Sequence, residues 1–276
     1  MRISILISAI ILIGGSACNK TSPLQQNVLI YGHGGTGFDV LNSAYAPNTI
    51  PSCELALSLY DLDGVEIDLQ YTKEGDLVLF HDDFLEKSTQ CKGRINDLSL
   101  DSICQCIYRK QYTNSYKHNV LSFDSFLNHY VRHWPQKRIS LNIQGSFNIP
   151  YTIDTLASRF VRKLKEYNIG EYASIECGST YFLKKIKEYD STRLCYAVGG
   201  QNESFVNEII TLNLDGIVCR FSETDNDLQK MLVDSGKHIT LYDLKIKRDY
   251  KETNWNGVHS MQTDNPVVSL KYFGRD

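Results

Sequence analysis

The sequence predicts an α/β fold, a (β/α)8 TIM barrel that forms a single domain, and three observations support this prediction. The chain has 276 residues, and barrels of this kind take about 250 residues in one unit. Short apolar runs alternate with longer amphipathic stretches, an order typical of a parallel sheet. There are about eight such units, which favours a closed barrel over an open doubly wound sheet. No glycine-rich phosphate-binding turn opens a helix, which also argues against the open sheet.

The apolar runs give the expected strands in chain order. They lie at 28–31, 64–68, 77–80, 139–143, 173–175, 194–198, 216–219 and 238–242. Amphipathic helical patterns lie between several of them, at 52–60, 153–167 and 181–189. The longest stretch between clear strands is 83–122, which we expect to form a small excursion over the barrel mouth. We find no internal repeat and no second domain.

The first residues have the layout of a signal peptide over 1–17, with Arg2 before the apolar run 3–13. That run is too short to span a bilayer comfortably. Cys18 follows Ser-Ala and resembles a bacterial lipobox, although Gly15 stands where a leucine is usual. The resemblance implies lipid attachment at Cys18, export, and a membrane anchor in the bacterial cell envelope. Residues 18–26 would be the tether of a barrel at 27–276. The alternative is ordinary cleavage, with Cys18 unmodified.

Composition is that of an ordinary globular protein, 42% hydrophobic and 22% charged. The net charge of -3 and the scattered Lys and Arg residues give no support for nucleic-acid binding.

The eight cysteines do not form a zinc-binding pattern. Cys177, Cys195 and Cys219 lie in or beside strand-like runs, where a thiol is a small buried apolar group. One disulfide remains open, with Cys91 as a candidate, but the sequence does not choose its partner. Cys104 and Cys106 are two residues apart and would face different ways on a helix.

Glu66 and Asp68 form the first candidate site. Two residues apart on a strand, they share one face, and the apolar residues between and beside them face the helices. Both carboxylates then point into the barrel, where they repel each other and lose hydration unless a cation joins them. All-oxygen ligands suit Mg2+ or Ca2+. The alternative is that each acid pairs with a Lys or Arg from a neighbouring strand.

Two histidines follow apolar runs, at the positions where barrel active sites are built. His33 follows 28–31 and His81 follows 77–80, so we expect both at the C-terminal rim of the barrel. Two imidazoles beside a divalent cation can share the proton transfers of phosphodiester cleavage, one as base and one as acid. We expect the remaining histidines to be structural; they are His118, His129, His133, His238 and His259.

The motifs around these residues resemble the glycerophosphodiester phosphodiesterase family. They are Gly32-His33-Gly34-Gly35, Ala46-Pro47-Asn48-Thr49, Glu66-Ile67-Asp68 and Phe80-His81-Asp82-Asp83, followed by Leu141-Asn142-Ile143-Gln144 and Thr263-Asp264-Asn265-Pro266. The resemblance implies a metal-dependent phosphoric diester hydrolase that splits a glycerophosphodiester into glycerol 3-phosphate and an alcohol. It assigns acid–base catalysis to His33 and His81.

The resemblance also implies the remaining roles in the site. Glu66, Asp68 and Gln144 would hold the cation, Mg2+ or Ca2+. Asn142, Ser146 and Asp82 would contact the small phosphodiester substrate.

The chain departs from the family pattern at four positions. Gly34 replaces an Arg and Ser146 a Lys, which removes positive charge for a phosphate. Pro47 replaces a Glu, and Gln144 replaces the third metal-binding Glu. Two alternatives therefore stay open. One is a non-catalytic, ligand-binding surface lipoprotein on the same barrel, and the other is a phospholipase-type enzyme that forms a cyclic phosphate. The sequence leaves the headgroup, the metal, the oligomeric state and protein partners open.

Overall fold

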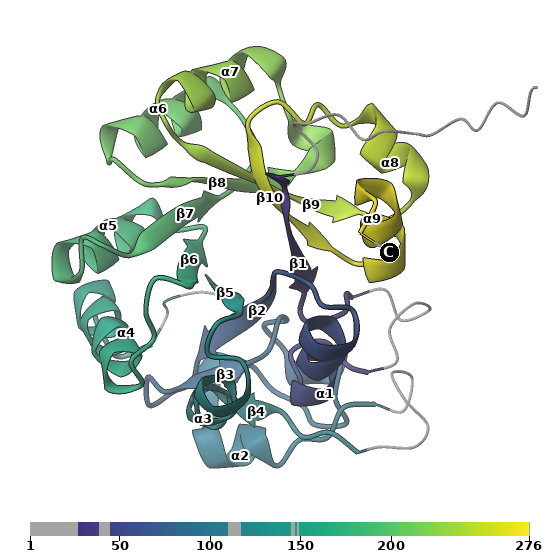
Figure 1. Cartoon of the computed structure of the whole chain (residues 1–276). Coiled ribbons are helices and arrows are strands. Elements are labelled where there is room, and N and C mark those ends of the chain that lie inside the picture. The colour runs from purple at the N-terminus through teal and green to yellow at the C-terminus, as the bar shows by residue number, and fades with distance from the viewer. Residues whose placement is uncertain (1–26, 39–44, 110–116, 145–146, 148, 276) are drawn as a thin grey trace, which may run out of the picture.

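The computed structural model describes residues 27–38, 45–109, 117–144, 147 and 149–275. Within them, eight parallel strands close into a barrel, because β1 pairs with both β2 and β10. The barrel strands are β1 (Leu29–His33), β2 (Gly64–Tyr71), β5 (Arg138–Ile143), β6 (Ala173–Cys177), β7 (Leu194–Val198), β8 (Gly216–Arg220), β9 (His238–Leu244) and β10 (Val258–Thr263). Figure 1 shows the helices outside this ring of strands. The predicted single-domain TIM barrel is confirmed.

One predicted barrel strand is wrong and one barrel strand was not predicted. The run at 77–80 forms β3 (Leu77–Leu79), which pairs antiparallel with β2 and continues to β4 (Leu121–Ser122) outside the barrel. It is apolar throughout because it is covered on both faces: Leu79 packs in the main core and Val78 in a second cluster. The eighth barrel strand is β10 instead, at the end of the chain.

Most of the helices begin at polar caps. Thr49, Ser122, Thr152, Ser179, Asn202, Asp225 and Asn265 each accept a backbone N–H from the first turn of the helix that follows. The helices are α1 (Ile50–Glu54), α3 (Phe123–His133), α4 (Ile153–Glu166), α5 (Thr180–Tyr189), α6 (Glu203–Thr211), α7 (Asn226–Asp234), α8 (Lys247–Glu252) and α9 (Pro266–Phe273). The predicted helices at 153–167 and 181–189 are confirmed to within one residue. The one predicted at 52–60 is α1 followed by a π-helical turn, Leu55–Leu59.

The stretch after β3 forms a small excursion beside the ring of strands, and its predicted place over the barrel mouth stays a prediction (Figure 1). It contains the short turns Leu85–Lys87 and Ile95–Asp97 and helix α2 (Leu100–Cys104). Its core is separate from that of the barrel and includes Phe80 and Ile103. A disulfide joins Cys91 to Cys106, which supplies the partner that the sequence left open. Because α2 ends at Cys104, Cys106 lies beyond the helix and is directed independently of it. Cys177, Cys195 and Cys219 are buried free thiols, as predicted.

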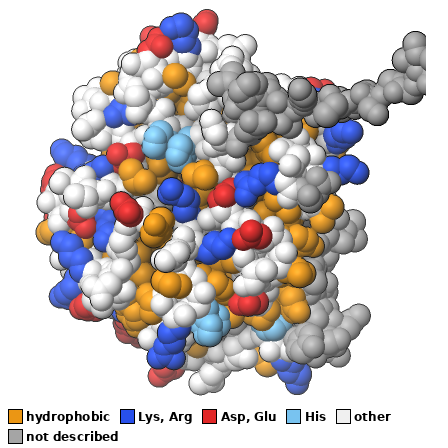
Figure 2. Space-filling view, viewed as in Figure 1, with side chains coloured by type: hydrophobic (Ala, Val, Ile, Leu, Met, Phe, Trp, Pro, Cys, Tyr) orange, Lys and Arg blue, Asp and Glu red, His pale blue; other side chains and the backbone are white. Residues whose placement is uncertain are grey.

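The surface carries mixed charge. On the face in Figure 2, basic, acidic and apolar side chains are interspersed without a continuous basic stripe. Of the helices in the described residues, none has the length and apolar character needed to span a membrane.

Candidate active site

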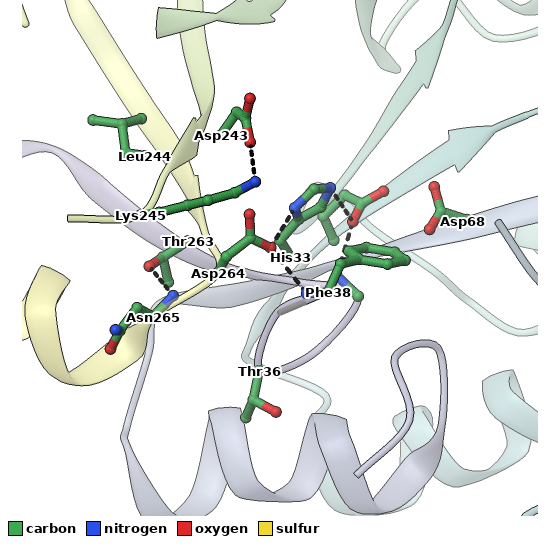
Figure 3. A network of polar contacts seen from close by, with 12 residues as sticks. His33, Thr36, Phe38, Asp68, Asp243, Leu244, Lys245, Thr263, Asp264 and Asn265 are labelled. Atoms are coloured by element: carbon green, nitrogen blue, oxygen red, sulfur yellow. Dashed lines mark hydrogen bonds and ion pairs between the residues drawn. The ribbon is translucent and has the colours of Figure 1, made fainter. Parts of the chain in front are cut away.

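His33 ends β1 and is held from the neighbouring strand. Its Nδ1 lies 2.9 Å from Oδ1 of Asp264, which directly follows β10, the strand that pairs with β1 (Figure 3). The same carboxylate oxygen accepts the backbone N–H of Phe38 at 2.9 Å. Burial alone would raise the pKa of Asp264, but His33 and the Phe38 N–H lower it below its usual value. Asp264 is therefore an ionised acceptor, and the Nδ1–H of His33 donates to it.

This pair also sets the ionisation of His33. Burial works to lower the pKa of the ring, but the charge and hydrogen bond of Asp264 outweigh it, so that the pKa is raised. No role was predicted for Asp264 from the sequence. The signal was present in the Thr263-Asp264-Asn265-Pro266 motif, but nothing local connected that motif with His33.

Glu66 and Asp68 are fully buried on β2, next to β1. Oε2 of Glu66 accepts the backbone N–H of Gly34 at 3.0 Å and lies 4.0 Å from Nε2 of His33. Asp68 accepts amide N–H groups from Asn48 (2.8 Å), Gln144 (3.0 Å) and Asn142 (3.4 Å). Within the described residues, neither carboxylate forms an ion pair with Lys or Arg, contrary to the alternative weighed from the sequence.

Asn48 is a second residue to which sequence reasoning gave no role. Besides donating to Asp68, it accepts the backbone N–H of Asp68 on its side-chain oxygen at 2.9 Å. Its own N–H donates to the carbonyl of Gly34 at 2.8 Å. Its backbone has φ 60°, a conformation that asparagine tolerates better than most residues. Asn48 thus ties the loop after β1 to the acidic strand, and its signal was the Ala46-Pro47-Asn48-Thr49 motif.

The donor set is compatible with a divalent cation. Oε1 of Glu66 is buried and has no hydrogen-bond partner. Burial, and then the charge of Asp68, raise the pKa of Glu66 well above its usual value. A buried carboxylate oxygen without a partner beside a second carboxylate is a site that a cation stabilises. No three His, Cys, Asp or Glu side chains in the described part of the chain are arranged to hold a metal. A cation here would therefore bind two carboxylates and an amide oxygen.

His81 lies near Asp68 and His33, as predicted, but the strand that it follows is not the one predicted. It does not follow a barrel strand. Because β3 runs antiparallel to β2, its end returns to the level of Asp68, whose carbonyl accepts the Phe80 N–H at 3.1 Å. The buried side chain of Gln70 donates to the carbonyls of Phe80, His81 and Asp82, at 3.3, 2.9 and 2.6 Å respectively.

Asp82 governs the charge of His81. Nδ1 of His81 lies 3.3 Å from Oδ1 of Asp82, and the Ser88 hydroxyl donates to the other oxygen at 3.0 Å. The bond to Asp82 is the main cause that raises the pKa of His81 to about 9. His81 is thus protonated at neutral pH. The predicted contact of Asp82 with substrate stays a prediction.

Phe38 brings the two histidines into one site. Its ring centroid lies 4.6 Å from that of His33 and 5.0 Å from that of His81. The imidazoles therefore flank one aromatic ring at the barrel mouth, beside the two buried carboxylates. Asn142 is buried and within reach of Asp68, while Ser146 and Cys18 lie outside the described residues.

Position 34 has no room for a side chain. Gly34 has φ 58°, and a Cβ built there would lie 2.8 Å from Cβ of Pro47 and 2.9 Å from Cε2 of Phe38. The side chains at 47 and 38 occupy the space next to His33 that a longer residue at 34 would need.

The other histidines lie elsewhere. His238 and His259 stack at 4.0 Å where β9 and β10 begin, at the opposite end of the barrel, and His238 bonds the Tyr196 hydroxyl. His129 and His133 stack on α3. These four histidines lie away from His33 and His81, and the structural roles expected for them stay predictions.

The chain is similar to known proteins in both sequence and structure. The model of the Glycerophosphoryl diester phosphodiesterase family matches residues 41–268. A glycerophosphodiester phosphodiesterase of Caldanaerobacter subterraneus is 26% identical over 141 residues, which are 51% of this chain and 56% of that protein. One from Bacillus altitudinis is 37% identical over 59 residues, 21% of this chain and 24% of that one. The matched segments thus span little more than half of these curated relatives, or less.

Solved structures show the same fold over nearly the whole chain. An Oleispira antarctica phosphodiesterase in complex with sn-glycerol-3-phosphate has a TM-score of 0.76 at 16% identity, covering 90% of this chain and 97% of that one. A glycerophosphodiester phosphodiesterase from Parabacteroides distasonis has a TM-score of 0.73 at 18% identity, covering 90% and 97%. With the family match over most of the sequence, these findings establish that the chain belongs to the glycerophosphoryl diester phosphodiesterase family.

Proposed function

We propose that the protein hydrolyses glycerophosphodiesters to glycerol 3-phosphate and an alcohol. The observation that carries the proposal is the pair His33 and His81, which flank Phe38 beside two buried carboxylates. Membership of the family supports the reaction class. The product bound in the Oleispira antarctica neighbour supports a small glycerophosphate ligand.

In this proposal, the two histidines divide the proton transfers. Asp264 holds Nδ1–H of His33, which leaves Nε2 to accept a proton from the attacking water, and the Asp264 carboxylate then stabilises the imidazolium. His81, with a pKa of about 9, is protonated at neutral pH and donates to the leaving oxygen.

Glu66, Asp68 and Gln144 would hold the cation, Mg2+ or Ca2+. Gln144 donates to Asp68 through its amide nitrogen, and a half-turn of the amide would present its oxygen instead. When bound, the cation would offset negative charge on the phosphoryl oxygens. Asn142 and Asp68 lie on adjacent strands in register, so the amide of Asn142 keeps Asp68 in place.

The non-catalytic alternative has one observation in its favour. Both oxygens of Asp68 already accept amide N–H groups, and Gln144 brings no charge, so the pair of acids is partly compensated without a metal. In the phospholipase-type alternative, the same histidines would serve attack by a hydroxyl of the substrate itself. Product analysis distinguishes hydrolysis, non-catalytic binding and formation of a cyclic phosphate.

The test is turnover of a panel of glycerophosphodiesters, followed by phosphorus NMR, with Mg2+, with Ca2+ and with EDTA. We expect metal-dependent release of glycerol 3-phosphate that His33→Ala or His81→Ala reduces at least about 10³-fold. His133→Ala, on the exposed end of α3, is the matched control and should keep full activity. A cyclic phosphate product would favour the phospholipase-type reading. No turnover by folded protein with either metal would contradict catalysis.

We further propose that Cys18 carries a lipid that anchors the exported protein to the membrane. The layout of residues 1–18 supports this. Cells fed a radiolabelled fatty acid should label the wild-type protein and not Cys18→Ser. Equal labelling of both would refute the anchor.

A further inference from the structure

The barrel mouth around His33 is strongly acidic. Glu66, Asp68 and Asp264 all lie close to the His33 ring or act on its charge. A phosphodiester is itself an anion, so these groups oppose its approach unless the proposed cation and cationic side chains compensate for them. The loop after β1 has no space for such a side chain at position 34, because Pro47 and Phe38 fill it.

Cationic side chains do reach this mouth from β8 and β9, which follow β10 in the order of strands around the barrel. Arg220 ends β8, and its guanidinium lies 5.9 Å from the ring centroid of Tyr242, with which it also forms a hydrogen bond. The Tyr242 ring in turn lies 6.1 Å from the His33 ring. Arg220 is exposed and in register with Tyr242 on the next strand. The Tyr242 ring therefore lies between Arg220 and His33, and Arg220 is on the solvent-exposed side of that ring.

Lys245 approaches from the end of β9. Figure 3 shows its side chain running past Asp264 towards His33. Its ammonium lies 2.8 Å from Oδ1 of Asp243 and is half-exposed, and its charge contributes to lowering the pKa of Asp264. Asp243 and Lys245 thus form an ion pair at the rim, and an incoming phosphate can share the ammonium with Asp243 because it has three donors.

We infer that Arg220 and Lys245 bind the phosphate group of the substrate, from the β8–β9 side of the mouth. The inference rests on the proposed function for its substrate class. Arg220 provides a planar donor that Tyr242 orients, and Lys245 provides a mobile point charge. Both side chains would contact phosphate oxygens from the β8–β9 side of the mouth, while the phosphorus lies within reach of both His33 and His81.

The test measures binding separately from turnover. Calorimetry with sn-glycerol 3-phosphate and with inorganic phosphate, in Mg2+, is compared for the full-length wild type and the variants Arg220→Met and Lys245→Met. We expect each substitution to weaken binding about tenfold, and the pair about a hundredfold. KM for glycerophosphocholine should rise in parallel, with a smaller change in kcat. Lys245→Arg should restore binding to within about threefold, and Arg220→Lys should recover part of the loss because it keeps the charge but not the planar donor.

Matched controls are Arg132→Met on α3 and Lys184→Met on α5. Both residues are exposed and lie on helices outside the ring of strands. They should bind like wild type. Unchanged binding by the double variant would overturn the inference, as would a loss that the charge-preserving variants fail to rescue. If wild type lacks turnover but its phosphate binding depends on Arg220 and Lys245, the proposed function fails and this inference stands. If wild type turns over and the double variant keeps its KM, only this inference fails.

Discussion

The two histidines of the mouth are held by different parts of the molecule. His33 sits on a barrel strand with only 17% of its side chain exposed, and its partner Asp264 comes from the adjacent barrel strand. His81 is 49% exposed and follows an antiparallel strand outside the barrel, and its partner Asp82 is its neighbour in sequence. The His33 ring is therefore held by barrel residues alone, whereas His81 has its backbone held by Gln70 of β2 and its ring held by Asp82, which Ser88 of the excursion contacts. Three predictions test this difference, in order of expected effect.

The largest effect should follow from breaking the buried pair. Asp264→Asn keeps the shape of the side chain but loses the charge that holds the His33 tautomer and stabilises its protonated form. We expect kcat to fall about 10³-fold, measured on glycerophosphocholine, with the unfolding free energy changed by less than about 3 kcal/mol. The control is Asp234→Asn at the exposed end of α7, which should have no effect. An unchanged kcat would show that His33 does not need Asp264.

A smaller effect should follow from loosening the excursion. The Cys91–Cys106 disulfide closes a loop with a sequence separation of 15, which corresponds to about 3 kcal/mol of loop entropy. The double variant Cys91→Ser, Cys106→Ser should lower kcat/KM about tenfold. Ser88 of the loosened excursion would hold Asp82 less firmly, and Asp82 holds the His81 ring. Hydrogen exchange should rise in residues 83–109 and stay slow in the barrel strands. Cys104→Ser, a free cysteine of the same excursion, is the control. Faster exchange with unchanged kcat/KM would separate His81 from the excursion.

The smallest effect concerns pH. The pKa of His81 is raised to about 9, mainly by its bond to Asp82, so the general acid keeps its proton up to that pH. Asp82→Asn removes that cause, so the pKa falls towards its usual value near 6.5. The alkaline limb of the pH profile of kcat/KM should therefore move to lower pH. Asp83→Asn, a weaker contributor, should move it less. An alkaline limb that stays in place would mean that His81 is not the acid.

The barrel and the central residues of the site could be predicted because their signals are local. Side chains alternate between the two faces of a strand, so Glu66 and Asp68, two residues apart, lie on one face. A histidine directly after an apolar run lies at a strand end. These relations need only a few consecutive residues. The same logic misassigned 77–80, because an apolar run reports burial on both faces and not the direction of the strand.

The parts that could not be predicted depend on contacts between distant segments. The strand β10 was missed because Ser260 and Gln262 face a polar barrel interior, where Gln262 bonds the buried carboxylate of Glu176, so that the run does not look apolar. The roles of Asp264 and Asn48 depend on partners 231 and 20 residues away. The partner of Cys91 depends on where α2 ends.

The packing at position 34 also limits the order in which this site can change. A side chain there collides with Pro47 and Phe38, and a backbone φ of 58° is a conformation that residues other than glycine rarely adopt. Smaller residues at 47 and 38 would have to come first. Loss of the Phe38 ring would leave the Asp264–His33 pair in place, because it is the backbone N–H of Phe38 that contacts Asp264. The three positions are thus sterically linked, and a side chain at 34 requires Pro47 and the Phe38 ring to shift.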